Sequence, residues 1–212
     1  MMNHKKITVG ILILALVLAG SGYWFFTLDN NILRRNIPIT YMSGESAFDT
    51  TDPRAIVGAM DYVFVGQIIN VSGTDYKYQD NTPFTNYEIR VIKNIKGELV
   101  LDTIHVQKMG GLTLDQSHYV VCEDDFLPFL GDICIFNTRA REDGTLGLYG
   151  ANSNVLLDFP ASQDVKKDLL TSIETSEVYH MFLTASIDPI ESTLTHGVSK
   201  YDVARNTGSR SN

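Results

Sequence analysis

Residues 60–71 read MDYVFVGQIINV, and this run is the strongest fold signal in the chain. It is rich in β-branched and aromatic residues, which favour strands. Its first half is apolar at successive positions and therefore predicts a strand that is buried on both faces. Gly66 lies inside the run, where a glycine indicates a β-bulge or a sharp bend.

The next run, residues 84–95, alternates between apolar and charged positions. The apolar side chains share one face and the charged ones the other: Tyr87, Ile89 and Val91 against Glu88 and Arg90. This alternation predicts a strand with one face on the core and one face in solvent. Between the two runs, residues 72–82 (SGTDYKYQDNT) are polar and predict a loop.

Further short strands are expected downstream, with no helical pattern between them: residues 103–107, 118–122, 132–137, 146–149 and 154–157. Residues 141–145 (REDGT) carry an Asp-Gly pair, which is a strong hairpin signal. Strands that follow one another in this way predict a mainly β domain over residues 56–158, an antiparallel barrel or sandwich.

The segments on either side of this domain have a different composition. Residues 27–55 are mixed and polar, and we expect a stalk. Residues 160–184 hold a helical spacing of apolar residues behind Ser162, which can cap a helix that packs on the barrel. Residues 185–212 become rich in Ser and Thr and predict a flexible tail.

Residues 7–26 (ITVGILILALVLAGSGYWFF) contain no charged residue. At about 1.5 Å of rise per residue such a helix reaches roughly 30 Å, the thickness of the hydrocarbon core of a bilayer. Lys5 and Lys6 precede it, so we expect residues 1–6 in the cytoplasm and the remainder outside. A cleaved signal peptide, with residues 19–22 as its cleavage region, is the alternative and would give a secreted protein. The aromatic residues 23–26 extend the run and favour a retained anchor.

The chain is acidic, with 17 Lys and Arg against 25 Asp and Glu and a net charge of −8. An acidic protein repels phosphate backbones, so a nucleic-acid partner is not expected. The two cysteines, Cys122 and Cys134, permit one disulfide in an exported protein. The alternative is two buried free thiols that act as small hydrophobic side chains.

No set of residues predicts catalysis or a cofactor. Glu123, Asp124 and Asp125 could supply oxygen ligands to Ca²⁺, but their spacing does not match an EF-hand, and a solvated acidic turn is the preferred interpretation. No histidines stand at the i,i+2 or i,i+4 spacing of a metal site, and no nucleophile motif is present. We therefore expect no catalytic, metal or cofactor site, and no enzyme activity.

A resemblance to a known family rests on four short motifs: residues 59–66 (AMDYVFVG), residues 85–91 (TNYEIRV), Lys96-Gly97 and Gly110-Gly111. In these motifs the chain resembles bacterial exported proteins that share the OB-fold of the tissue inhibitors of metalloproteinases and of netrin modules. The resemblance implies an OB-like Greek-key barrel and a binding module. The animal inhibitors bind the zinc of the protease through an N-terminal cysteine, whereas both cysteines here lie deep in the domain, so inhibition of proteases is not expected.

OB-type barrels often bind ligands with a loop after the first strand. Tyr76, Tyr78 and Phe84 lie in or beside that loop and form the candidate partner-binding loop. The alternative is that these rings pack down on the rim of the barrel.

The leading functional hypothesis is therefore a membrane-anchored, extracytoplasmic module that binds a protein or a component of the cell envelope. Two alternatives stay open. One is an exported hydrolase or metal-dependent enzyme built from distant residues, and the other is a structural subunit that uses residues 7–26 to assemble a membrane complex.

Overall fold

The computed structural model describes residues 37–159 and 168–203. The chain divides into two compact units, Met1–Pro38 and Ile39–Asn212, and the second unit contains nearly all of the described residues. The expected membrane span at residues 7–26 lies outside the described residues. Among the helices that are described, none is long and apolar enough to cross a membrane.

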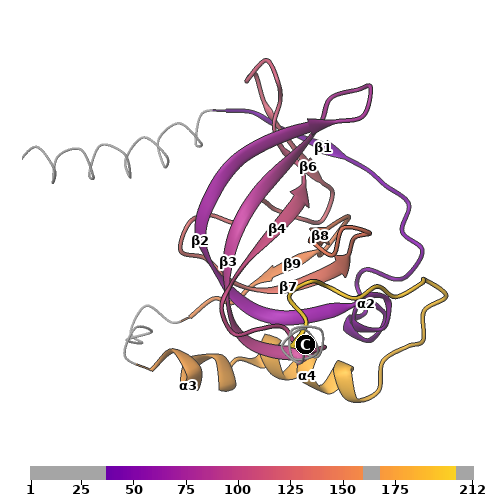
Figure 1. Ribbon diagram of the computed structural model, residues 1–212, viewed down its shortest axis with the longest axis vertical. Coiled ribbons are helices and arrows are strands. Elements are labelled where there is room, and N and C mark those ends of the chain that lie inside the picture. The colour runs from indigo at the N-terminus through magenta and orange to yellow at the C-terminus, as the bar shows by residue number, and fades with distance from the viewer. Residues whose placement is uncertain (1–36, 160–167, 204–212) are drawn as a thin grey trace, which may run out of the picture. The chain divides into compact units, whose positions relative to one another are not determined.

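The second unit is mainly β, with a few short helices (Figure 1). In chain order its elements are β1 (Ile39–Met42), α2 (Pro53–Ala59), β2 (Tyr62–Lys77), β3 (Thr82–Lys96), β4 (Thr103–Met109), β5 (Gly111–Leu112), β6 (Tyr119–Cys122), β7 (Ile133–Ala140), β8 (Leu146–Leu148), β9 (Asn154–Leu156), α3 (Leu169–Glu174) and α4 (Glu177–Ile187). The strands expected from the sequence are thus present, with bounds that differ by a few residues.

Five strands form a partly closed ring in the order β2-β3-β4-β8-β7, because β7 pairs with β2 as well as with β8. The pairings are antiparallel except for β4 with β8, which is parallel. Strand β9 extends the ring by pairing with β7. A second, smaller sheet has the order β1-β6-β5.

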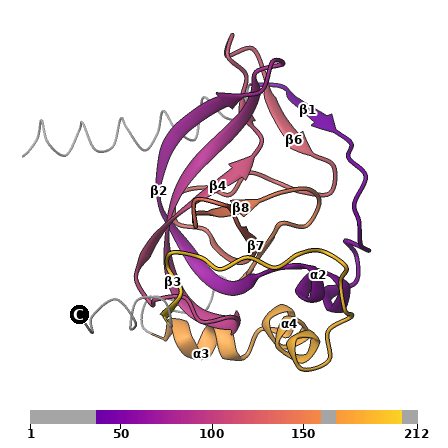
Figure 2. The ribbon, with the colours of Figure 1, turned by 45° about the vertical axis from the view of Figure 1, so that its right-hand side comes forward.

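Strand β2 lies between two hydrophobic cores. Tyr62 and Phe64 belong to the core inside the ring, and the Phe64 ring stacks on Phe136 with their centroids 5.4 Å apart. Val63 and Val65 point the other way, into a core that α2 and α4 cover. These helices lie along one end of the ring (Figure 2). The prediction of a strand buried on both faces is therefore confirmed.

Gly66 occupies a bulge in β2, as expected, because the pairing with β3 shifts register between Val65 and Gly66. A Cβ atom at Gly66 would lie 2.6 Å from Cγ2 of the buried Ile89. The glycine thus lets two strands approach closely while β2 bends around the core.

The polar stretch 72–82 is not the loop that we expected. Strand β2 continues to Lys77 and β3 begins at Thr82, so the turn is only residues 78–81. The register runs without interruption from Thr74 opposite Thr85 to Lys77 opposite Thr82. This end of the hairpin is exposed at many positions and therefore carries polar residues. Its sequence does not alternate between apolar and polar residues, so the pattern did not indicate a strand.

The expected stalk and the expected single helix are also corrected. Residues 39–42 form β1, which pairs in parallel with β6, and α2 begins at Pro53, so the folded unit takes in part of the stretch 27–55. The helix expected at 160–184 is two helices, α3 and α4, because the Ser176 side chain caps a new helix by accepting a hydrogen bond from Tyr179 N. Residues 27–36 and 160–167 lie outside the described residues.

The expectation of a flexible tail at 185–212 is wrong for residues 185–203. Residues 185–187 belong to α4, and the segment 188–203 forms a strap against the ring of strands. Asp61, whose side chain is 1% exposed, accepts a hydrogen bond from Gly197 N at 3.0 Å and lies 2.8 Å from His196 Nδ1. The strap is held by polar contacts, which composition does not reveal. Residues 204–212 lie outside the described residues.

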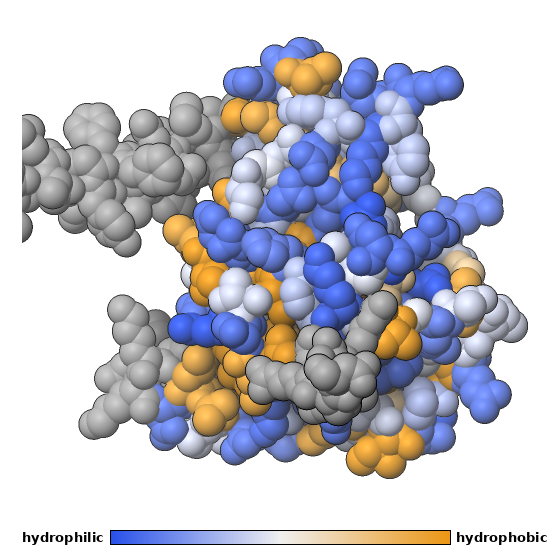
Figure 3. Space-filling view, viewed as in Figure 1, coloured by the Kyte–Doolittle hydropathy of each residue, from blue (hydrophilic) through white to orange (hydrophobic). Residues whose placement is uncertain are grey.

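The face of the molecule seen in Figure 3 is largely hydrophilic, and its hydrophobic residues lie in separate patches. On that face, polar side chains rather than one broad apolar patch are therefore the features that could recognise a partner.

The bulge at Gly66 gives the first prediction. Replacing Gly66 with Ala forces Ile89 or the strands to move, and we expect the free energy of unfolding to fall by about 1–3 kcal/mol in chemical denaturation followed by circular dichroism. Gly44→Ala is the control, because a Cβ there meets nothing within 4 Å. Equal stability of the two variants would contradict the close approach at Gly66.

The strap gives the second prediction. Asp61→Ala removes the acceptor of Gly197 N and of Ala140 N, and hydrogen bonds to a charged group stabilise by about 1.5–3 kcal/mol. We expect amide hydrogen exchange within residues 196–203 to become about tenfold faster or more. Asp49→Ala is the control, since the Asp49 carboxylate bonds only locally with Thr51. Unchanged exchange in the strap would show that Asp61 does not hold it.

Candidate functional site

The three residues of the predicted binding loop have different environments. Tyr78 begins the β2–β3 turn with a φ of 62° and is 75% exposed. Phe84 is buried, at 1% exposed, and Tyr76 is half-buried with its hydroxyl donating to Thr113 O at 3.3 Å. Tyr78 is therefore the one ring of the three that is presented to solvent, while the other two pack as the alternative interpretation expected.

Phe84 links the turn to a distant part of the chain. Its ring meets Tyr78 edge to face at 6.0 Å and meets Tyr149, which follows β8, at 6.4 Å. Lys77 Nζ lies 5.0 Å from the centroid of the same ring, within the range of a cation–π contact. The buried ring of Phe84 thus contacts Tyr78, Tyr149 and Lys77.

Gln107, on β4, joins this cluster to the β7–β8 turn. Its Oε1 accepts hydrogen bonds from Lys77 Nζ and from Arg141 Nη1, the latter at 2.6 Å. Its Nε2 donates to Asn86 Oδ1 at 2.8 Å and to Asp75 Oδ2 at 3.0 Å. The buried amide of Gln107 therefore orients Lys77 and Arg141, two cations that are far apart in the sequence.

We define the basic–aromatic surface as Lys77, Tyr78, Arg139, Arg141 and Tyr149, supported by Phe84 and Gln107. Sequence reasoning found Tyr78 and Phe84 but missed the others. The Asp-Gly turn signal had located Arg141 on a hairpin, but only the parallel pairing of β4 with β8 brings that hairpin beside Gln107.

The three cations of this surface form no salt bridge with any residue in 37–159 or 168–203, whereas Arg54, Lys93 and Lys108 each do. Arg139 instead donates from Nη2 to Thr195 O at 2.7 Å. Burial lowers the pKa of Lys77 and the nearby Arg141 charge lowers it further, whereas the Asp75 and Asp143 carboxylates oppose both effects. Burial also raises the pKa of the Tyr149 hydroxyl, against the opposing effect of Arg141.

Such an arrangement suits an anionic group. Guanidinium groups bind carboxylate and phosphate with paired hydrogen bonds, and exposed tyrosine supplies a contact area at low entropic cost. The positive charges repel one another, so an anion placed between them would be stabilised.

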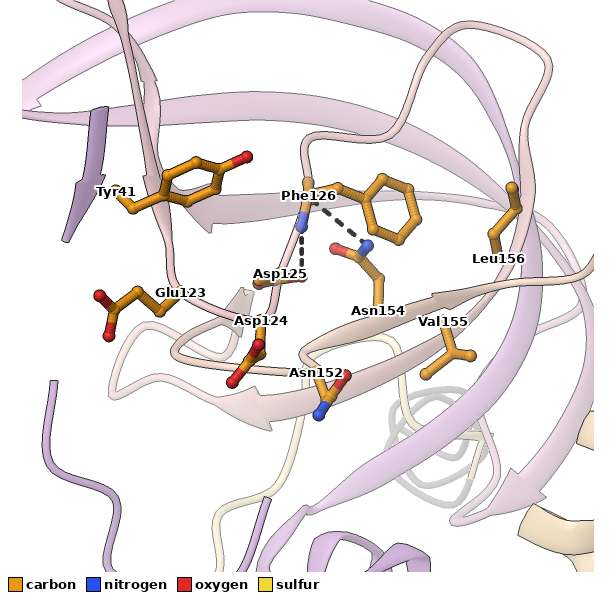
Figure 4. Close-up of a pocket in the computed structure, with 9 residues that line it drawn as sticks. All are labelled: Tyr41, Glu123, Asp124, Asp125, Phe126, Asn152, Asn154, Val155 and Leu156. Atoms are coloured by element: carbon orange, nitrogen blue, oxygen red, sulfur yellow. Dashed lines mark hydrogen bonds between the residues drawn. The ribbon is translucent and has the colours of Figure 1, made fainter. Parts of the chain in front are cut away.

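The acidic turn after β6 is built differently from the solvated turn that we expected. Glu123 and Asp124 are exposed and line a pocket with Tyr41, Phe126 and Asn154 (Figure 4). The Asp125 side chain, however, is 1% exposed and pairs with Lys108 Nζ. In the described part of the chain, no group of three or more His, Cys, Asp or Glu side chains is placed to hold a metal ion.

Ser153 completes this buried ion pair. Its Oγ accepts from Lys108 Nζ at 2.6 Å and donates to Asp125 Oδ2 at 2.7 Å. Burial lowers the pKa of Lys108, and the Asp125 carboxylate opposes that effect. The side chains of Lys108, Asp125 and Ser153 are all buried. They form an internal brace between β4 and the segments before and after β7.

Cys122 and Cys134 are both free thiols and both buried, so the disulfide that the sequence permits is not formed. Burial raises the pKa of each thiol. They behave as the small hydrophobic side chains of the alternative interpretation.

No family model matches the chain. No curated protein matches it either.

The buried brace gives the third prediction. Lys108→Met leaves the Asp125 carboxylate buried without its counter-charge, and we expect the free energy of unfolding to fall by about 3–5 kcal/mol. The double variant Lys108→Met/Asp125→Asn removes both charges and is expected to recover part of that loss. If chemical denaturation finds the single variant as stable as the unaltered protein, the ion pair is not a brace.

Proposed function

We propose that the chain is a membrane-anchored, extracytoplasmic module that binds an anionic group of a protein or of a cell-envelope component. Residues 7–26 would hold it at the membrane, and the basic–aromatic surface would make the contact. The observation that carries the proposal is the group of Lys77, Arg139 and Arg141, three cations without a salt bridge in the described chain, beside an exposed tyrosine of a net acidic protein.

We further propose that the ring is an OB-type barrel. In chain order its strands are β2, β3, β4, β7 and β8, and the last two exchange places in the ring so that β4 lies beside β8. A five-stranded, partly open Greek-key barrel of this kind supports the family resemblance of residues 59–111.

The position of the surface supports the same proposal. OB-type barrels bind ligands on their second and third strands and with the loops that follow the first and the fourth strand. Here the corresponding parts are β3, β4, the turn at 78–81 and the turn at 141–145. Tyr78 and Arg141 lie on these two turns, and Gln107 lies on the third strand of the ring.

The partner that fits is compact rather than a nucleic acid. Lys77, Arg139 and Arg141 form a small basic area on a protein whose net charge is −8. A long phosphate backbone would extend beyond this area into acidic surroundings, which would repel it. A carboxylate-bearing protein segment or a carboxylate- or phosphate-bearing envelope component engages the surface without that repulsion.

The test is crosslinking and capture of the full-length protein from intact membranes. We expect Tyr78→Ala and Lys77→Gln each to reduce capture of a defined partner by about tenfold, because exposed aromatic and cationic contacts of this kind contribute on the order of 1–2 kcal/mol. Tyr78→Ala removes no buried contact that the fold depends on, so its thermal stability should change little.

Two variants serve as matched controls. Tyr41→Ala removes another exposed tyrosine, 58% exposed on β1, and Lys93→Gln removes a lysine that already pairs with Glu174. Both should capture the partner as well as the unaltered protein does. Loss of capture in the controls, or full capture by the Tyr78 and Lys77 variants, would place the contact elsewhere.

A further inference from the structure

A cavity of about 610 Å³ adjoins the basic–aromatic surface. One of its walls is the segment 43–50 between β1 and α2, which runs alongside the barrel in both ribbon views (Figures 1 and 2). Arg139, Arg141 and Tyr149 line it from the side of β7 and β8. The surface that the proposed function uses therefore continues into a partly open cavity.

The lining of this cavity is mainly apolar and adaptable. Met42, Met60 and Met109 contribute to it together with Phe48 and Leu194. Methionine side chains are flexible and polarisable, and they fit apolar surfaces of differing shape. A volume of this size, apolar walls and a few polar groups are typical of sites for small molecules.

The wall formed by residues 43–50 is anchored at its two ends. Met42 O accepts from Glu123 N at 3.0 Å, and Thr50 O accepts from Asn152 Nδ2 at 2.8 Å. Between these anchors, Phe48 N donates to Ser46 Oγ at 3.4 Å, a contact within the segment itself. The wall is therefore fixed to the rest of the fold at both of its ends.

The charges around the cavity differ from one part to another. Arg139 and Arg141 stand on the barrel side, whereas Glu45, Glu123 and Asp124 line the parts formed by the segment 43–50 and by the chain after β6. An occupant with one negative group would be attracted to the arginines and repelled from the carboxylates, so its orientation is determined.

We infer that this cavity binds a small amphipathic anion, with a carboxylate or phosphate at Arg139 and Arg141 and an apolar body against the three methionines. The inference rests on the proposed function and deepens it, because it names the chemical class of the group that the basic–aromatic surface recognises. The occupant is the anionic apolar end of that partner, and the small-molecule probes used below carry the same chemistry.

The experiment uses the full-length protein in nanodiscs of zwitterionic lipid and isothermal titration with three probes that share one apolar body. The probes are 2-naphthoate, the uncharged 2-naphthylmethanol and the cationic 2-naphthylmethylammonium, with empty nanodiscs as the blank. We expect 2-naphthoate to bind at least about tenfold more tightly than either of the others. Equal binding of the three probes, or tighter binding of the ammonium probe, would overturn the inference.

Variants locate the site. Arg141→Gln and Arg139→Gln should each weaken 2-naphthoate by about tenfold, and Ala151→Trp, which adds a large ring to the cavity lining, should abolish its binding. Glu123→Gln, which removes one of the lining carboxylates that repel the anion, should strengthen binding. Circular dichroism confirms that each variant is folded before titration, and binding that survives Ala151→Trp would place the probe outside the cavity.

A second readout depends on Cys122, which lines the same cavity and is 6% exposed, whereas Cys134 is 0% exposed. Bound 2-naphthoate should slow alkylation of Cys122 in the full-length protein, and an unchanged rate would contradict occupancy of the cavity. A failure of the probes to bind the cavity is distinguishable from a failure of the proposed function. If Tyr78→Ala and Lys77→Gln lose the membrane partner while no probe binds, the surface recognises its partner without the cavity.

Discussion

The structure of residues 39–159 and 168–203 depends on one constraint, the burial of both faces of β2. The strand contributes Phe64 to the core inside the ring and Val63 and Val65 to the core under the helices. It also pairs along its length with β3 and at its start with β7. A strand that must satisfy two cores and two neighbours has a single register, and the ring closes around that register. Gly66 supplies the bend that this geometry requires.

Closure of the ring is what creates the basic–aromatic surface. The β2–β3 turn and the β7–β8 turn are far apart in sequence, and they meet because β8 returns to pair in parallel with β4. Gln107 then fixes the relation between them by accepting from Lys77 and Arg141. Grouping like charges opposes folding by mutual repulsion, and the Asp75 and Asp143 carboxylates partly offset that repulsion at Lys77.

The polar interior has a separate, structural task. The brace of Lys108, Asp125 and Ser153 ties β4 to the segments that flank β7. Asp61 holds the strap of residues 188–203 by accepting hydrogen bonds from backbone amides. Both devices join segments that are distant in the chain, and each is specific because a buried carboxylate without its partners is strongly destabilising. They act together with apolar contacts, since Leu194 and Tyr201 of the strap also pack against the two cores.

The sequence by itself determined the β character of the domain, most of its strands and the turn at 141–145. Those features follow from local patterns: the doubly apolar run at 60–71, the alternation at 84–95 and an Asp-Gly pair. The membrane segment at 7–26 is equally local, and it remains a prediction because the described residues do not include it. Tyr78 was found because it lies in a polar stretch beside a predicted strand.

Only the tertiary structure decided which of these residues act together. The burial of Phe84, the packing of Tyr76, the amide of Gln107 between two cations and the enclosure of Asp125 by Lys108 all depend on contacts between strands that are distant in the chain. The position of the strap and the true length of the β2–β3 hairpin were likewise decided only by the tertiary structure. The physical reason is that polar groups carry no periodic signal. A carboxylate or amide has the same local sequence whether water or a distant backbone amide satisfies it, and folding alone makes that choice.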